Sequence, residues 1–291
     1  VTINYTREIT KLGKLIATEN ISPLKRYSYL VGKNEPNHTA QSQLSPLLID
    51  ENKNPTIQNL IKAFTIEKVT KEFFNDYKKL TYELAGELKN VQSDSKILNE
   101  FKNKRIDELS FAKKIMSQLI FVFFLQKKGL LAFQKKNFEN LTGEKKFLRK
   151  LFDKNKNFFN NVLEPLFYEG FSRTHNNNFY EPLKCYLPNI SVSLFDPINN
   201  YNWKKTKIMI NNSVFEKIFV VFERYNFTVS EEQPLDIEVA VDPEMLGKVF
   251  ESLIDENIRK STGAFYTPRI IVHNMCIETI AKYLSNNQKK I

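Results

Sequence analysis

The residues best suited to binding chemistry lie near the end of the chain, in the segment KSTGAFYTPRIIVHNMCIETIAKYL (260–284). Phe265 and Tyr266 supply aromatic surface, Thr267 is a typical helix N-cap, and Pro268 suits the first helical position. The positive end of a helix beside an aromatic ring can hold a carboxylate next to a flat or cationic group. The same pattern also fits a helix whose cap is purely structural. The apolar residues expected on the buried face of that helix are Ile271, Val272, Met275, Ile280 and Leu284.

A second candidate site is the most basic part of the chain, residues 126–160. The whole chain has 43 Lys and Arg against 33 Asp and Glu, a net charge of +10, and most of the surplus lies in this region. Phenylalanines are interleaved with its cations, which is typical of helices with Phe facing a core and Lys facing solvent. A solvated basic face is also what the phosphates of DNA would contact, so the two interpretations are compatible. The candidate DNA-binding residues are Lys135, Lys136, Lys145, Lys146, Arg149 and Lys150.

Several other kinds of site lack the residues that they need. The three histidines, His38, His175 and His273, are far apart in sequence and form no metal-ligand pair. Two cysteines exclude a disulfide framework and a cysteine-only metal site, and the eight glycines include no phosphate-binding loop. We therefore predict no catalytic residue and no metal ligand in this chain.

The spacing of apolar residues predicts a mainly α protein, an irregular helical bundle with a few short strands in the region 185–240. Apolar residues three or four apart predict one helix from Thr65 to about Leu84. Another is predicted from Asp107 to Lys128, ending at Gly129. Further helices are predicted over residues 213–224, 242–255 and 268–284.

We expect three regions: an irregular N-terminal segment (1–60), a helical connector domain (61–240) and the start of a further domain (241–291). The longest apolar run, residues 119–125, is far shorter than the ~20 residues needed to cross a bilayer, so we expect no membrane span and a cytoplasmic location. The chain begins at Val1 rather than Met and ends on a polar stretch, so we expect a segment of a longer protein. We also expect it to be a monomer.

The motif GAFYTPRIIV (263–272) resembles the one that opens the catalytic domain of adenine-specific DNA methyltransferases of restriction-modification systems. Upstream, DPEMLGKVFESLI (242–254) is similar to the helix that precedes this motif in type IIG enzymes, which fuse nuclease and methyltransferase in one chain. Residues 26–40, 121–132 and 222–236 also look like segments of that family, in the same order. The resemblance therefore extends, in patches, from about Arg26 to Leu284.

The resemblance implies that Phe265, Tyr266, Thr267 and Pro268 lie against the methionine part of S-adenosylmethionine and form one wall of its site. It also implies double-stranded DNA as a partner, and a longer bacterial enzyme whose nuclease uses Mg²⁺. The family's Asp-Pro-x-x-Gly-x-Gly loop and Asn-Pro-Pro-Tyr motif, which carry the ribose and the flipped adenine, do not follow Tyr266. The region 241–291 is thus expected to be the start of a methyltransferase domain, cut before its cofactor loop. The chain alone would connect the nuclease and methyltransferase domains and be inactive, with neither S-adenosylmethionine nor Mg²⁺ bound to it alone.

Two other functions remain open from the sequence. One is a stand-alone basic helical module that binds nucleic acid, whose affinity would fall steeply with salt. The other is a scaffold that binds only protein and shows no affinity for nucleic acid at low salt.

Overall fold

The computed structural model divides into two compact units, residues Val1–Val241 and Asp242–Ile291. In the second unit the structure describes Thr267 and helix α11 (Arg269–Asn286). The residues described in the whole chain are 3–9, 15–21, 26–33, 35–48, 54–133, 143–173, 175–190, 193–227, 236–238, 241, 267 and 269–286.

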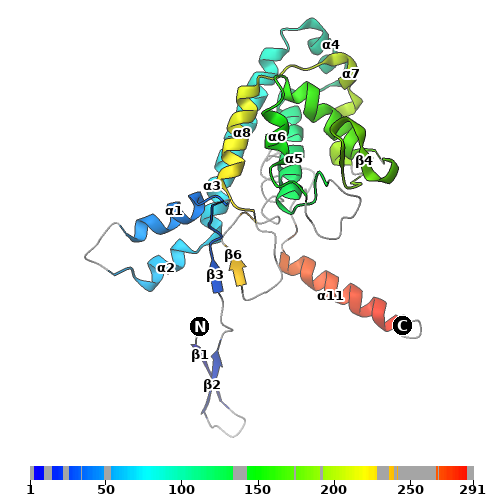
Figure 1. Cartoon of the computed structure of the whole chain (residues 1–291). Helices are drawn as coiled ribbons and strands as arrows, with labels where there is room; N and C mark the ends of the chain where they lie inside the picture. The colour runs from blue at the N-terminus through cyan, green and yellow to red at the C-terminus, as the bar shows by residue number, and fades with distance from the viewer. Residues whose placement is uncertain are drawn as a thin grey trace. The chain divides into compact units, whose positions relative to one another are not determined.

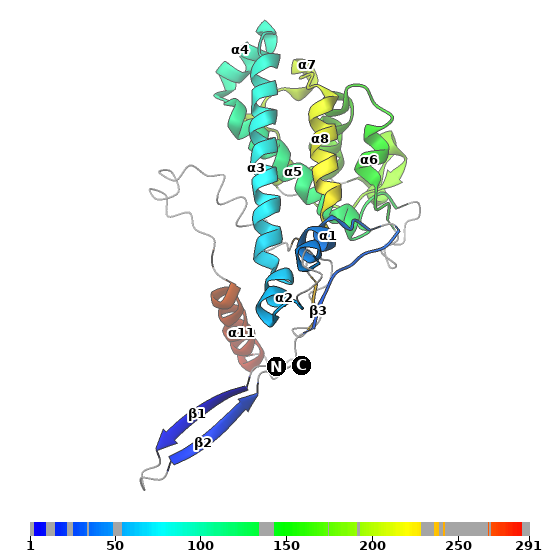
Figure 2. The same ribbon diagram turned by 90° about the vertical axis from the view of Figure 1, so that its left-hand side faces the viewer.

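Three long helices form the centre of the first unit: α3 (Ile66–Val91), α5 (Glu108–Lys127) and α8 (Asn212–Arg224). Helix α3 packs against both α5 and α8, and the three run alongside one another in both views (Figures 1 and 2). All three occur where the spacing of apolar residues predicts helices. Their mutual packing supplies the surface on which the shorter elements of the unit are placed.

The ends of two of these helices follow from local chemistry. The side chain of Asp107 accepts a hydrogen bond from the N–H of Ser110 at 2.8 Å and so caps the start of α5. Just after the end of α5, Gly129 adopts a positive φ of 67°, as a glycine at that position commonly does. Thr65 precedes α3 as predicted, but its hydroxyl donates to the carbonyl of Ile61 at 2.9 Å instead of capping the helix.

Aromatic rings fill the space between α3, α5 and α8. Phe73 of α3 is completely buried, and its ring centroid lies 6.0 Å from that of Phe222 on α8 and 5.3 Å from that of Tyr225. Phe123 of α5 approaches Phe222 to 5.5 Å between centroids. Aromatic pairs at such distances add ~0.5–1.5 kcal/mol beyond the burial of their area, so this cluster joins the three helices.

Shorter elements complete the first unit. The α-helices are α1 (His38–Leu44), α2 (Ile57–Ala63), α4 (Ser95–Lys104), α6 (Phe147–Phe152) and α7 (Trp203–Thr206). The 3₁₀ turns are η1 (Ser45–Leu47), η4 (Asn176–Asn178), η5 (Glu181–Leu183), η6 (Ser193–Phe195) and η7 (Ile198–Asn200). Two π-helical segments, η2 (Phe159–Leu163) and η3 (Leu166–Phe171), lie on either side of Glu164 and Pro165.

The described strands form three small pairs. Strands β1 (Ile3–Ile9) and β2 (Leu15–Ile21) are antiparallel, β3 (Arg26–Ser28) is parallel to β6 (Asp236–Glu238), and β4 (Phe179–Tyr180) is antiparallel to β5 (Cys185–Tyr186). The prediction that residues 1–60 are irregular is wrong for β1, β2, β3 and α1, and for the first residues of α2. Strands β1 and β2 form a regular antiparallel ladder, in which each strand pairs with the backbone groups of the other.

The prediction of a mainly α fold is confirmed. Strands β5 and β6 lie within the region 185–240 where short strands were expected, whereas β1–β4 precede it. Within the same region, residues 193–195 form the 3₁₀ turn η6 and residues 207–210 are irregular rather than strands. Within the described ranges, no helix combines the length and the apolar character needed to cross a membrane.

Candidate nucleic-acid interface and cofactor segment

The segment expected to contact a cofactor lies in the second unit. Thr267 is exposed and stands two residues before Arg269, the first residue of α11. Phe265, Tyr266 and Pro268 lie outside the described residues. Helix α11 has 18 residues, so its first turn carries the positive end of a full helix dipole and favours an anionic group such as a carboxylate.

The apolar side chains of α11 are exposed rather than buried. Their exposed fractions run from 42% at Val272 to 61% at Met275. The prediction that this face is buried is therefore wrong for the described structure, because the spacing of apolar residues indicates a face that can be covered but not what covers it. The residues concerned are Ile271, Val272, Met275, Ile280 and Leu284.

The basic region begins at a turn that is tied to the end of α5. The N–H of Gly143 donates to the carbonyl of Gly129 at 2.9 Å, and the N–H of Glu144 donates to the carbonyl of Leu131 at 2.8 Å. A Cβ atom added at Gly143 would lie 2.3 Å from the Leu131 carbonyl oxygen, so only glycine fits this close approach. Gln126 of α5 then accepts a hydrogen bond at 3.0 Å from the first turn of α6. These contacts fix the position of Lys145 and of the start of α6 relative to the end of α5.

Arg149, one of the predicted DNA-binding residues, holds α6 against α8. Its guanidinium donates to both carboxylate oxygens of Glu223, at 3.0 and 2.9 Å, and to Glu216 at 2.6 Å. The same group lies over the rings of Phe152 and Phe219, 5.7 and 5.2 Å from their centroids. Hydrogen bonds to Glu223, with those to Glu216, raise the pKa of Arg149, so its charge is permanent and is neutralised within the chain. Arg149 therefore has a role in packing α6 against α8.

Lys150 is also paired within the chain. It forms a salt bridge with Glu144, and its hydrogen bond to that carboxylate is the main cause that lowers the pKa of Glu144. Glu144 accepts in addition a hydrogen bond from the N–H of Lys146 at 3.0 Å. Glu144 is therefore a positioning residue for the start of α6, a role that its place between Gly143 and Lys145 in the sequence does not reveal.

Lys145 and Lys146 are exposed and lie near Lys127, and we name these three residues the basic turn. Burial lowers the pKa of Lys127, the carboxylates of Glu35 and Glu223 raise it, and the charges of Lys145 and Lys146 lower it. Like charges gathered in this way create a positive potential that attracts an anion. Within the basic turn, Lys145 and Lys146 are exposed to solvent, whereas Lys127 is partly buried. Lys135 and Lys136 lie outside the described residues.

The phenylalanines of the basic region face the core. Phe147, Phe158 and Phe159 are buried, whereas Lys154 and Lys156 are exposed. This is the arrangement with Phe inward and Lys outward that the sequence suggests. It leaves a solvated basic face, which is the chemistry that a phosphate backbone requires, so the orientation is compatible with both interpretations of the region.

A buried carboxyl group lies in the π-helical part of the chain. Glu164 has no exposed surface, and its two oxygens accept hydrogen bonds from the hydroxyl of Tyr201 at 2.6 Å and the amide of Asn160 at 2.8 Å. The hydroxyl of Tyr168 lies 3.3 Å from that of Tyr201. Burial raises the pKa of Glu164 to about 8, although the two hydrogen bonds act in the opposite direction. In the described part of the chain, no three His, Cys, Asp or Glu side chains are grouped so as to hold a metal ion.

Comparison with known proteins gives one similarity of note. The chain is 27% identical, over 255 aligned residues, to a protein of Methanocaldococcus jannaschii that is named as a type II restriction enzyme and methyltransferase. The alignment covers 77% of this chain but 20% of that relative, so the chain spans about a fifth of the length of the protein it matches. No family model and no solved structure matches the chain. The similarity establishes a relationship to a restriction-modification enzyme.

Proposed function

We propose that this chain is the helical region that connects the nuclease and the methyltransferase of a single-chain, type IIG-like restriction-modification enzyme. The observation that carries the proposal is the similarity to a relative whose name includes both activities, over most of this chain and a fifth of that protein. The ordered set of segments from Arg26 to Leu284 supports it independently. The whole enzyme would transfer a methyl group from S-adenosylmethionine to adenine in DNA and cleave DNA with a Mg²⁺-dependent nuclease.

In this proposal the second unit contributes one wall of the cofactor site. Phe265 and Tyr266 would contact the methionine part of S-adenosylmethionine, with Thr267 and Pro268 at the start of α11. The exposure of Thr267 and the positive end of an 18-residue helix fit a ligand that carries a carboxylate. When bound, S-adenosylmethionine would supply the methyl group, while these residues would orient its amino-acid end.

The basic turn is proposed to contact the phosphate backbone of double-stranded DNA. Lys145 and Lys146 are exposed, and neither forms an ion pair with another described residue. Arg149 is already paired with two glutamates, so its proposed part is to hold α6 in place rather than to bind phosphate itself. Phosphate contacts of this kind would set the register of the enzyme on DNA without reading the sequence.

The assay that tests the proposed function uses the full reading frame that contains this chain. We expect transfer of labelled methyl from S-adenosylmethionine to adenine in unmethylated DNA, and Tyr266→Ala should reduce it at least tenfold. A tenfold loss corresponds to ~1.4 kcal/mol, a modest effect for removing one aromatic contact. Tyr283→Ala on α11 is the matched control, because it removes an exposed tyrosine of the same unit. Equal activity of Tyr266→Ala and wild type would exclude Tyr266 from the cofactor site.

DNA binding by the chain tests the basic turn. We expect the double variant Lys145→Gln/Lys146→Gln to bind duplex DNA more weakly and to lower the slope of log affinity against log salt by about 1–2, since each phosphate contact contributes ~0.9. Fluorescence anisotropy between 50 and 200 mM salt measures this slope. Lys96→Gln/Lys102→Gln removes the same charge from exposed positions on α4 and should leave the slope nearly unchanged. Identical slopes for the two double variants would mean that net charge, not the basic turn, determines binding.

The stand-alone nucleic-acid-binding module is the second candidate, and the exposed lysines of the basic turn favour it equally. The two functions differ in the methyl-transfer assay. If the full reading frame folds, binds DNA and transfers no methyl group to DNA of varied sequence, the stand-alone module is the better account.

A further inference from the structure

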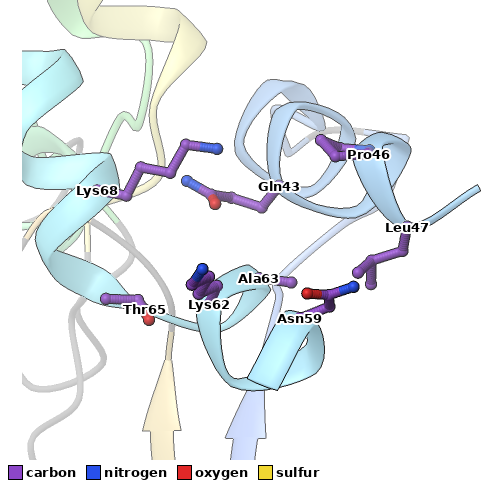
Figure 3. A pocket seen from close by; sticks show the side chains of 8 residues that line it. All are labelled: Gln43, Pro46, Leu47, Asn59, Lys62, Ala63, Thr65 and Lys68. Atoms are coloured by element: carbon purple, nitrogen blue, oxygen red, sulfur yellow. The ribbon is translucent and has the colours of Figure 1, made fainter. Parts of the chain in front are cut away.

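A cavity lies at the opposite end of α3 from α4, where α1, η1 and α2 meet the start of α3. The cavity has a volume of about 520 Å³, and its side chains come from all four elements (Figure 3). It belongs entirely to the first unit. The residues that line it are Gln43, Pro46, Leu47, Asn59, Lys62, Ala63, Thr65 and Lys68.

Gln43 is the unusual member of this set. It is only 2% exposed, yet neither its amide nitrogen nor its amide oxygen has a hydrogen-bond partner among the described residues. Figure 3 shows the amide end of Gln43 directed away from α1 and toward the side of the cavity where Lys68 lies. A buried amide that is left unpaired is unfavourable, so a ligand that pairs with it would gain affinity. Because one atom donates and the other accepts, the fitting partner must present an acceptor and a donor side by side.

The charged residues described at the cavity are two lysines. Lys62 and Lys68 are both exposed there, and none of the lining residues that the structure describes is acidic. Thr65 precedes the 26-residue helix α3 without capping it, since its hydroxyl donates to the carbonyl of Ile61 instead. The first-turn N–H groups of α3 thus donate no hydrogen bond to the N-cap side chain, and the positive end of the helix adds to the two ammonium groups. This combination favours a phosphate.

From this geometry we propose that the cavity is a nucleotide-binding site. Lys62, Lys68 and the start of α3 bind the phosphate, and the amide of Gln43 pairs with the edge of the base. Adenine presents a donor and an acceptor side by side, the pattern that a glutamine amide matches with two hydrogen bonds. Pro46 and Leu47 supply apolar surface for the face of the base, and 520 Å³ lies within the range of small-ligand pockets. The nucleotide is either free or the exposed terminal nucleotide of a strand. The site is independent of the proposed methyltransferase role.

Calorimetric titration of the full chain tests the site with three probes: AMP, adenosine and inorganic phosphate. We expect AMP to bind at least tenfold more tightly than either adenosine or phosphate, because only AMP engages both ends of the cavity. A 5′-phosphorylated single-stranded oligonucleotide, compared with AMP, distinguishes a strand end from a free nucleotide. Whichever of the two binds more tightly identifies the source of the nucleotide.

Two variants separate the roles of amide and lysine. Gln43→Leu keeps the apolar volume and should weaken AMP at least fivefold while leaving the affinity for phosphate unchanged. Lys68→Met should weaken AMP and phosphate together by about tenfold. Lys89→Met, at an exposed position near the other end of α3, is the matched control and should change neither. Circular dichroism verifies that each variant is folded.

The proposal is overturned by either of two results. One is the absence of AMP binding by the folded wild-type chain, which would mean that water satisfies Gln43. The other is equal AMP affinity for wild type, Gln43→Leu and Lys68→Met, which would place the nucleotide elsewhere. Neither result affects the methyl-transfer assay of the larger reading frame, so the two proposals fail separately.

Discussion

The free energy of unfolding is expected to fall as the pH rises from about 5 to about 8, and the cause is Glu164. Burial raises the pKa of this carboxyl from 4.5 to about 8 in the folded chain. Its stabilising contribution is therefore fully present below pH 4.5 and is lost as the pH rises through 8, because the unfolded chain releases this proton above pH 4.5 and folding must take it up again. At ~1.4 kcal/mol per pKa unit, the loss across this window is on the order of 5 kcal/mol at most.

Urea unfolding at pH 5, 6.5, 8 and 9 measures this dependence. Glu164→Gln keeps an oxygen for the hydroxyl of Tyr201 but cannot ionise, so its stability should change much less between pH 5 and 8. Glu181→Gln, which removes an exposed carboxyl from η5, should retain the wild-type dependence. A wild-type stability that stays flat from pH 5 to 8 would show that Glu164 ionises at its ordinary pKa.

Phe73→Ala is expected to lower the free energy of unfolding by ~3–5 kcal/mol, the usual cost of removing a fully buried phenylalanine from a core. The ring of Phe73 is completely buried and contacts those of Phe222, Tyr225 and Phe227, at 6.0, 5.3 and 5.7 Å between centroids. Its removal opens a cavity where α3 meets α8 and the chain after it. Such a loss is a large fraction of the total stability of an ordinary domain.

The shift of the urea midpoint at constant slope gives the size of this effect. Tyr82→Ala is the control, because Tyr82 belongs to the same helix but is 53% exposed. We expect it to change the stability by less than ~0.5 kcal/mol. Comparable losses in the two variants would mean that the aromatic cluster is not where α3 obtains its stability.

The long helices were predictable because each carries both a periodic apolar face and a recognisable end. The buried face of α3, which contains Phe73 and Tyr77, is predicted by the spacing of its apolar residues alone. Asp107 and Gly129 mark the two ends of α5 because a side-chain cap and a left-handed glycine are local chemistry. The tertiary packing of α3 and α5 then stabilises the helices that the local sequence already favours.

Elements without a long periodic apolar face were not predicted. Helix α4 is short and polar, and its buried residues Ile97 and Phe101 are too few to show a period. Strands β1 and β2 each depend on the other for their backbone hydrogen bonds. The π-helical segments around Glu164 depart from the 3.6-residue period on which helix prediction depends.

The candidate sites, too, were predictable only where they depend on local sequence. Sequence alone located a basic region, but it could not show that Arg149 is paired with Glu216 and Glu223, which follow it by 67 and 74 residues. Nor could it show that Gln43 is buried, since that burial is created by the approach of several elements to one another. Composition indicates which charges are present, whereas only the tertiary structure shows which of them remain for a ligand.

The hydrogen bonds that join Gly129 and Leu131 to Gly143 and Glu144 have a consequence for how this protein can change during evolution. They close the chain on itself before α6 begins, so both ends of the closure can stay fixed whatever number of residues lies between Phe133 and Gly143. Doubling the length of such a closed segment costs only ~0.6 kcal/mol of chain entropy. Related proteins can therefore differ in length here, and a tag or reporter can be inserted, while the presentation of Lys145 and Lys146 is preserved.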